Sequence, residues 1–155
     1  MEPIEELRYL TLAAQREGSR LLAAALQPLQ LTPSQAEVLR VLQEHEPLSL
    51  IALGERLVCE TGSPSRLVQG LVEDGLVERV VAPADKRMVT LSLTGAGRER
   101  AAAVRAIEAQ FYEATASLLK DAPLAEMLGF FWRFVEGKPA GMALARRIGK
   151  EKPAC

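Results

Sequence analysis

The sequence predicts a mainly α-helical fold with a small β-hairpin, arranged as a winged helix-turn-helix between long N- and C-terminal helices. Within residues 48–94, two short segments with apolar side chains at helical spacing precede two segments rich in β-branched residues. Longer segments of helical periodicity lie on both sides of this stretch. A helix-turn-helix followed by a hairpin can dock on duplex DNA, with its second helix in the major groove.

The two helices of the helix-turn-helix have sequence signals at their ends. The first is predicted over residues 49–58, from leucines at helical spacing. The second begins at Ser63 and Pro64, an N-cap residue followed by proline at the first helical position. It ends at Gly75, which suits the left-handed C′ position, and Leu76 can then close back on the helix as in a Schellman motif.

The predicted hairpin consists of residues 77–81 and 89–93, which are rich in β-branched side chains. The segment between them, residues 82–87, is longer than a tight hairpin turn and carries charge at its tip. A cationic tip of this kind can reach the DNA backbone or the adjacent minor groove. The sequence therefore predicts a wing directly after the second helix.

Further helices are predicted over residues 3–26, from 32 to about 46, 98–120 and 124–136. The second of these starts at a capping box formed by Thr32 and Gln35, and Thr94 is the predicted N-cap of the third. The predicted organisation is one compact domain with four parts: an N-terminal dimerisation helix (1–30), the winged helix-turn-helix (31–94), C-terminal dimerisation helices (95–137) and a basic tail (138–155).

Composition is ordinary for a globular chain of this length. The 155 residues include 19 Lys and Arg against 20 Asp and Glu, so composition does not indicate a basic nucleic-acid-binding domain, and only the placement of the cations does. No run approaches the roughly 18–20 apolar residues of a membrane span. The acidic N-terminus lacks the regions of a signal peptide, which favours a cytoplasmic location.

The sequence offers little that an enzyme could use. It holds one histidine, no glycine-rich phosphate loop and no H-E-x-x-H motif, so neither catalysis nor a cofactor is expected. Its two cysteines are too few for a disulfide framework and too far apart for a metal-binding spacing, so no metal is expected.

Three motifs make the winged-helix prediction more specific. They are the run Gly75-Leu76-Val77-Glu78-Arg79, the wing motif Asp85-Lys86-Arg87, and Leu91-Ser92-Leu93-Thr94 followed by Gly97. With these motifs the chain resembles the MarR-type winged-helix regulators over most of its length. The resemblance implies a homodimeric transcriptional regulator, here a repressor, whose DNA binding is often released by a small ligand or by thiol oxidation.

The candidate DNA-binding residues lie on the second helix and the wing: Ser63, Ser65, Arg66, Gln69, Arg79, Asp85, Lys86 and Arg87. Arginine can recognise guanine and glutamine can recognise adenine through two hydrogen bonds. For Ser63 the alternative is a role as N-cap. Arg79 could contact a phosphate or pair with an acidic side chain. The resemblance implies that Arg87 is held by Asp85, or works beside it, while a tip side chain enters the minor groove.

One winged helix reads only a few base pairs, so a homodimer on a near-palindromic operator is expected. The candidate dimerisation residues are Leu7, Leu10, Leu21, Phe111, Leu118, Phe131, Trp132 and Val135. For the first helix, packing in the core of its own chain and packing in a dimer are equally compatible with the pattern. For the aromatic residues of the last helix, the alternative to packing is a ligand pocket lined by their rings.

Two further alternatives remain open at the level of sequence. Cys59 closes an apolar run and fits a small buried hydrophobic residue, whereas a redox role would need a lowered thiol pKa and access to solvent. A winged helix can also serve only protein–protein assembly, because fold does not fix function. Cations at both the second helix (Arg66) and the wing (Lys86 and Arg87) favour duplex DNA over that alternative.

Overall fold

The computed structural model describes residues 1–59, 63–82 and 85–150, with the side chains of residues 82 and 85–88 left out. Its elements are α1 (Pro3–Leu26), the short 3-10 helix η1 (Gln27–Leu29), α2 (Pro33–His45), α3 (Leu50–Gly54), α4 (Pro64–Glu73), β1 (Val77–Ala82), β2 (Asp85–Leu93), α5 (Gly95–Leu118), α6 (Leu124–Val135) and α7 (Pro139–Arg147). The mainly helical fold with one antiparallel hairpin confirms the predicted fold class.

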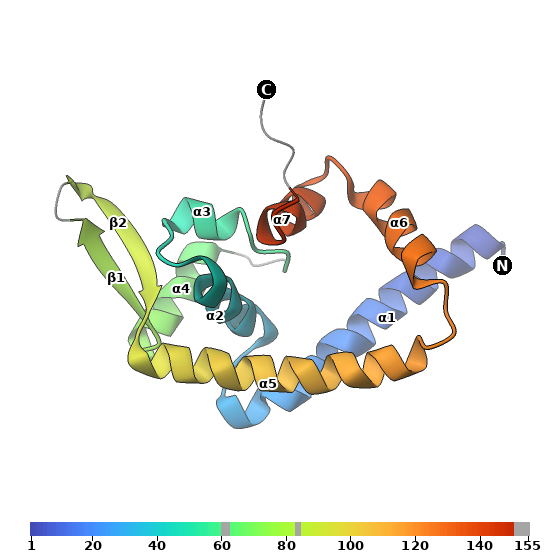
Figure 1. Ribbon diagram of the computed structural model, residues 1–155, viewed down its shortest axis with the longest axis horizontal. Helices are drawn as coiled ribbons and strands as arrows, with labels where there is room; N and C mark the ends of the chain where they lie inside the picture. Colours follow the sequence, from blue (N-terminus) through green and yellow to red (C-terminus); the bar gives the residue numbers. More distant parts are fainter. Residues whose placement is uncertain (60–62, 83–84, 151–155) are drawn as a thin grey trace.

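The long helix α5 forms the spine of the molecule (Figure 1). The helix-turn-helix and the hairpin lie near its N-terminal end, and α1 crosses it farther along. At its C-terminal end the chain turns into α6, and α7 then returns towards α2 and α3. Helix α7 therefore lies against α2, although the two helices are distant in sequence.

Local signals set the start of α2 and the end of α4. The Thr32 hydroxyl accepts a hydrogen bond from the Gln35 amide, and the Gln35 side chain accepts one from the Thr32 amide, which confirms the capping box. Gly75 has φ of +69°, and the Leu76 amide donates to the carbonyl of Leu71. This is the Schellman ending that the sequence predicts, and it turns the chain sharply from α4 into β1.

The first helix of the pair is shorter than predicted, since α3 ends at Gly54 rather than near residue 58. After Gly54 the amides of Arg56 and Leu57 donate to carbonyls three residues back, which tightens the chain into turns. Leu57 remains buried, so its apolar spacing reflects packing in the core rather than a continued helix.

The second strand starts earlier than predicted. It begins at Asp85, inside the charged motif, and Ala82 pairs with Asp85. Backbone hydrogen bonding extends the ladder through residues whose side chains gave no strand signal. At the base of the wing, Leu48 and Leu91 exchange backbone hydrogen bonds, which fastens the hairpin to the segment before α3.

The core lies beneath the winged helix, where α2, α4, the base of the wing and the first half of α5 meet. Fully buried side chains include Leu39 and Leu42 of α2, Leu71 of α4 and Leu93 of β2. The apolar seam of α5 changes character along its length, because Val104 is buried whereas Leu118 is 86% exposed. Only its first half is used by the protomer's own core.

The C-terminal stretch predicted as a basic tail contains a helix, α7. Its sequence signals are Pro139 at the first helical position and the basic pair Arg146 and Arg147 in the last turn. None of the helices in the described part of the chain combines the length and the hydropathy that a membrane crossing requires.

Candidate nucleic-acid interface

Helix α4 presents a polar face to solvent and an apolar face to the core. Val68 and Leu71 are buried, whereas Ser65, Arg66 and Gln69 are exposed. In the part of the chain that the structure describes, Arg66 makes no hydrogen bond or ion pair, so its guanidinium is available to a partner. Ser63 occupies the N-cap position, but its hydroxyl accepts no capping hydrogen bond. The structure therefore brings three predicted contact residues together on one helix face.

Gln69 and Arg79, predicted as separate contacts, touch each other. The Arg79 guanidinium donates to Gln69 Oε1 at 2.9 Å, and Gln69 Nε2 donates to Glu73 Oε1 at 2.8 Å. In the free protein Arg79 thus pairs with an amide rather than with an acidic side chain, and its contact with a phosphate stays a prediction. The chain Glu73–Gln69–Arg79 fixes the orientation of the Gln69 amide and joins α4 to the first strand of the wing.

The remaining predicted contacts belong to the wing. The backbone of Asp85, Lys86 and Arg87 is paired in β2, while their side chains lie outside the described part of the structure. Their contacts with DNA stay a prediction. The backbone places them at the outer end of the hairpin, away from its base on α5 (Figure 1).

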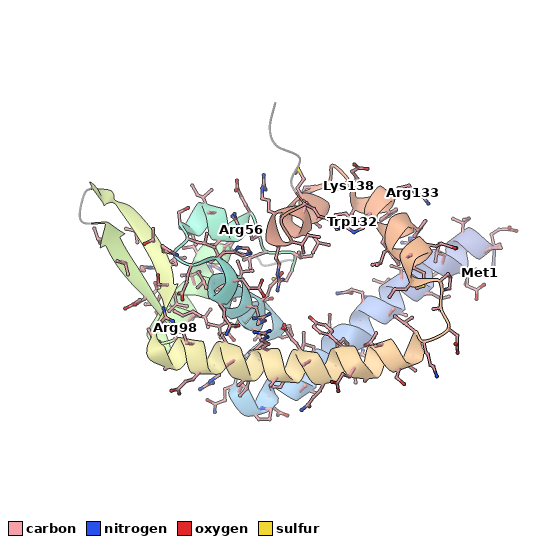
Figure 2. The ribbon with its side chains drawn as sticks, viewed as in Figure 1. Met1, Arg56, Arg98, Trp132, Arg133 and Lys138 are labelled. Carbon is pink, nitrogen blue, oxygen red and sulfur yellow. The ribbon has the colours of Figure 1, made fainter. Side chains whose placement is uncertain are left out.

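A glutamate at the end of α2 fixes the base of the wing. Glu46 accepts from the Leu93 amide at 2.6 Å and from the Arg98 guanidinium at 2.9 Å. Arg98 also donates to the Leu93 carbonyl at 2.7 Å, and Figure 2 shows it where the wing meets the start of α5. The direction of the wing is therefore set by a charge-assisted contact between α2, β2 and α5.

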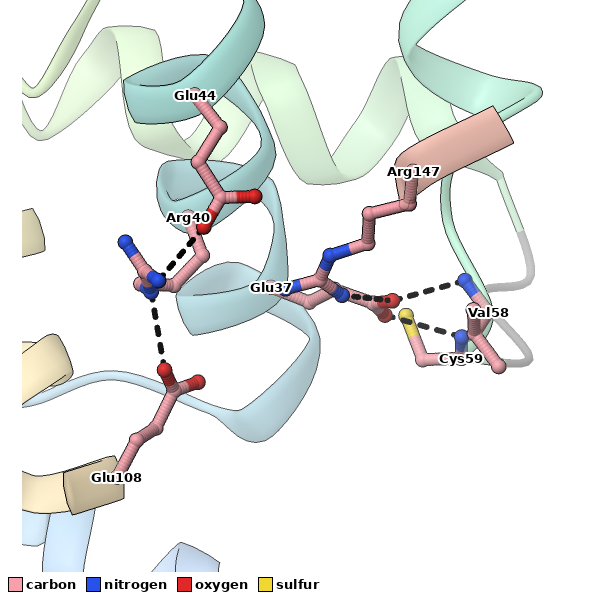
Figure 3. Close-up of polar contacts among 7 residues, drawn as sticks. All are labelled: Glu37, Arg40, Glu44, Val58, Cys59, Glu108 and Arg147. Atoms are coloured by element: carbon pink, nitrogen blue, oxygen red, sulfur yellow. Dashed lines mark hydrogen bonds and ion pairs between the residues drawn. The ribbon is translucent and has the colours of Figure 1, made fainter. Parts of the chain in front are cut away.

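A second glutamate of α2 holds the segment that leads to α4. The two Glu37 carboxylate oxygens accept from the amides of Val58 at 2.8 Å and Cys59 at 3.0 Å (Figure 3). One turn further along α2, Arg40 pairs with Glu108 of α5 at 2.9 Å. Helix α2 thus fixes the chain entering α4 and joins the winged helix to α5.

Cys59 lies in the same cluster, half-buried against the core. Burial, and then a hydrogen bond with the Glu37 carboxylate, raise the pKa of its thiol to about 11. Arg56, the cation nearest in sequence, donates to the Ala52 carbonyl. This environment favours the small-hydrophobe interpretation of Cys59 over the redox interpretation.

We expect Cys59 to react slowly with an alkylating reagent in a Cys155→Ser protein at pH 8. A pKa near 11 rather than 9.0 leaves about a hundredfold less thiolate, partly offset by the higher nucleophilicity of a more basic thiolate, so the net slowing is roughly tenfold. The reference is the same protein unfolded in urea. Glu37→Gln removes a group that raises the pKa and should speed the reaction. A folded-state rate that levels off near pH 8 would contradict this assignment.

The helices outside the winged helix expose large apolar side chains. No described residue of α6 is buried, and Phe131 and Phe134 are 41% and 64% exposed. All the predicted dimerisation residues are exposed or only partly buried: Leu7, Leu10, Leu21, Phe111, Leu118, Phe131, Trp132 and Val135. In α1, Leu26 is buried and Leu22 packs against the protomer's own core, whereas the predicted dimerisation residues Leu7, Leu10 and Leu21 are exposed.

A cavity of about 280 Å³ lies between α1 and α5, lined by Ala14, Gln15, Gly18, Ser19, Leu22, Glu108, Phe111 and Tyr112. Its aromatic lining comes from α5, so the rings of α6 do not form it as the ligand-pocket alternative expected. Burial, and then the charge of Glu108, raise the pKa of the Tyr112 hydroxyl. Tyr112 therefore stays protonated and can donate a hydrogen bond at neutral pH.

Several positioning residues gave no sequence signal. Glu37, Glu46, Arg98, Arg40 and Glu108 act through contacts with residues far away in the chain. Glu73, the last residue of α4, acts on the candidate surface through its hydrogen bond with Gln69. Among the residues that the structure describes, no group of three or more His, Cys, Asp or Glu side chains could hold a metal ion.

The sequences of known proteins point to one family. A family model described as the MarR family matches residues 29–88. The chain is 32% identical over 92 residues to the organic hydroperoxide resistance transcriptional regulator of Bacillus subtilis strain 168, covering 59% of this chain and 63% of that protein. It is 34% identical over 93 residues to the HTH-type transcriptional regulator TtmR of Methylorubrum extorquens strain PA1, covering 60% of this chain and 48% of that protein. The chain thus spans about half to two thirds of the length of these curated relatives.

Solved structures extend the likeness to nearly the whole chain. A mutant of MarR from E. coli complexed with operator DNA has a TM-score of 0.70 and 27% identity, covering 86% of this chain and 95% of that one. MarR of Staphylococcus aureus in complex with salicylate and kanamycin shares the fold, with a TM-score of 0.72, 21% identity, and 85% and 89% coverage. In sequence and in fold, the chain is therefore similar to the MarR family of winged-helix regulators.

Proposed function

We propose that the protein is a sequence-specific regulator of transcription, a repressor, which binds a near-palindromic duplex operator as a homodimer. The observation that carries the proposal is the exposed face of α4, with Ser65, Arg66 and Gln69 side by side above a buried apolar face. Such a helix, followed by a wing, fits the major groove while the wing lies along the backbone. The operator-bound structure of the E. coli relative supports the same docking here. Because duplex DNA is the proposed partner, we also propose a cytoplasmic location.

Dimerisation is supported by the apolar side chains that the protomer leaves uncovered. Phe130, Phe131 and Phe134 of α6 and Leu10 of α1 are all at least 40% exposed. Patches of this kind on a soluble chain usually mark an interaction site, since covering them removes apolar surface from water. A second copy of the chain would cover them and place two recognition helices in successive major grooves, about 34 Å apart.

We expect Phe131→Glu to raise the dissociation constant of the dimer at least ~100-fold, because a carboxylate would be buried without a partner in an apolar interface. Sedimentation equilibrium over a range of protein concentrations measures it. Arg133→Glu is the matched control on the same helix, since Arg133 is already exposed and polar and points away from the body of the molecule (Figure 2). Equal behaviour of the two variants would argue against α6 as the interface.

Regulation by a small ligand is proposed from the cavity between α1 and α5. Its polar lining includes Glu108, which also pairs with Arg40 of α2. A molecule that occupied the cavity would lie beside the contact that joins α5 to the winged helix. It could therefore favour one orientation of the winged helix over another if it binds the two unequally.

The alternative is a winged helix that serves only protein assembly. The slightly acidic net charge of −1 is compatible with it. Arg66, which pairs with none of the residues that the structure describes, lies on the exposed face of α4 and argues for DNA, because an assembly surface has no need of a cation at that position.

The proposal is tested by selecting genomic fragments with the purified protein at low salt and footprinting those that it retains. We expect a shared near-palindrome whose half-sites are one helical turn apart, protected by a dimer. Retention of no fragment over random DNA, together with capture of a stoichiometric protein partner, would support the assembly alternative instead.

A further inference from the structure

The chain segment that enters α4 is held by one carboxylate. Glu37 of α2 uses both oxygens to accept the amides of Val58 and Cys59, and its side chain is only 11% exposed. These two amides lie just before the stretch that leads to the N-terminus of α4. The next residue that the structure describes is Ser63, the N-cap of α4.

The same carboxylate is paired with a cation from the other end of the chain. Arg147 Nη1, in the last turn of α7, donates to Glu37 Oε1 at 3.2 Å, and the Arg147 side chain is 22% exposed (Figure 3). The two residues are 110 positions apart. A largely buried carboxylate is stabilised in its charged form by such a partner, so the presence of α7 affects how firmly Glu37 holds the two amides.

Helix α7 is in turn fixed to α6. An added Cβ at Gly141 would lie 2.1 Å from the Val135 carbonyl oxygen, so the two helices approach more closely there than any other residue allows. Movement of α6 therefore displaces α7. Helix α6 carries the exposed aromatic side chains that the second copy would cover in the proposed dimer. The contact between Val135 and Gly141 would therefore connect that second copy to Arg147.

We propose that Arg147 is a positioning residue for DNA binding, acting through Glu37 on the Val58 and Cys59 amides. Helix α7 then works as a clamp that couples α6 to Val58 and Cys59, the last described residues before the recognition helix. The inference rests on the proposed function, because it concerns how that function is positioned. It adds a second connection to the one between Arg40 and Glu108, one turn earlier on α2.

The experiment compares Arg147→Gln, Arg147→Lys, Glu37→Gln and the double variant with wild type, and uses Arg133→Gln as the matched control. Amide hydrogen exchange at Val58 and Cys59, measured by NMR without DNA, reports the clamp itself. The amides of Leu91 and Leu93 in β2 report global stability. Affinity for the selected operator fragment is measured in parallel.

In Arg147→Gln we expect exchange at Val58 and Cys59 to speed up roughly threefold to tenfold, with a similar loss of operator affinity, as for a partly buried ion pair. Exchange at Leu91 and Leu93 should not change. Arg147→Lys keeps the positive charge and should restore much of the wild-type exchange rate and affinity. In a protein that already carries Glu37→Gln, Arg147→Gln should cause no further change.

Unchanged exchange at Val58 and Cys59 in Arg147→Gln would overturn the proposal, as would an additive effect in the double variant. Equal acceleration in Arg133→Gln would also overturn it. If the wild type bound no DNA, the proposed function would fail, while the exchange data would still decide whether α7 clamps the segment.

Discussion

Gly97→Ala is expected to destabilise the protein by about 3 kcal/mol or more, at the upper end of what overpacking costs. A Cβ at this position would lie 1.9 Å from the Leu76 carbonyl oxygen. That carbonyl already accepts from the Thr94 amide at 3.1 Å, so it cannot simply turn away. The first turn of α5 would have to lift off the end of α4, which would disturb the recognition helix and the base of the wing together.

The matched control is Gly95→Ala, two residues earlier in the same turn. An added Cβ there meets nothing within 4 Å, and alanine is the better helix former, so this variant should equal or exceed wild-type stability. Urea unfolding at one fixed protein concentration compares the three proteins, because the stability of a dimer depends on concentration. Wild-type stability in Gly97→Ala would show that α5 does not pack on Leu76 as described.

Arg66→Ala is expected to weaken operator binding roughly tenfold to hundredfold per half-site, the range for loss of a bidentate contact to guanine. The exposed Arg66 side chain makes no competing ion pair within the described residues, so nothing inside the protein has to be broken before it reaches a base. Base preference should relax at one position in each half-site. Titration against the selected operator, and against the operator changed at one base pair at a time, measures both effects.

Arg133→Ala removes the same charge from α6 and should leave both affinity and base preference as in wild type. If Arg66→Ala lost affinity equally for every sequence, Arg66 would be a phosphate contact rather than a base contact. If neither variant changed DNA binding, α4 would not be the recognition helix.

Most of the helix boundaries could be predicted from local sequence signals. Pro3 and Pro28 bracket α1, the Thr32–Gln35 box starts α2, and Gly75 ends the recognition helix, each through the backbone of its own neighbourhood. The errors lie where tertiary contacts decide. The length of α3 and the start of β2 at Asp85 depend on packing and pairing that no short window contains, whereas α7 was missed although Pro139 and its basic last turn mark its two ends.

The candidate site divides in the same way. Arg66 and Gln69 could be placed on the exposed face of α4 from helical periodicity alone. The groups that hold α4 and the wing could not, because Glu37 and Glu46 meet partners 21 to 110 residues away. Such contacts form only in the folded chain, so they cannot be predicted from the periodicity of the sequence.

The most direct test of the account is binding of the purified protein to the DNA upstream of its own gene, over a series of salt concentrations, for wild type and Arg87→Ala. We expect saturable binding by a dimer, with log affinity falling linearly with log salt as counterions are released. Arg87→Ala should bind more weakly and show a smaller salt slope. No sequence-preferring binding at low salt, to this DNA or to any genomic fragment, would contradict the assignment of α4 and the wing to DNA.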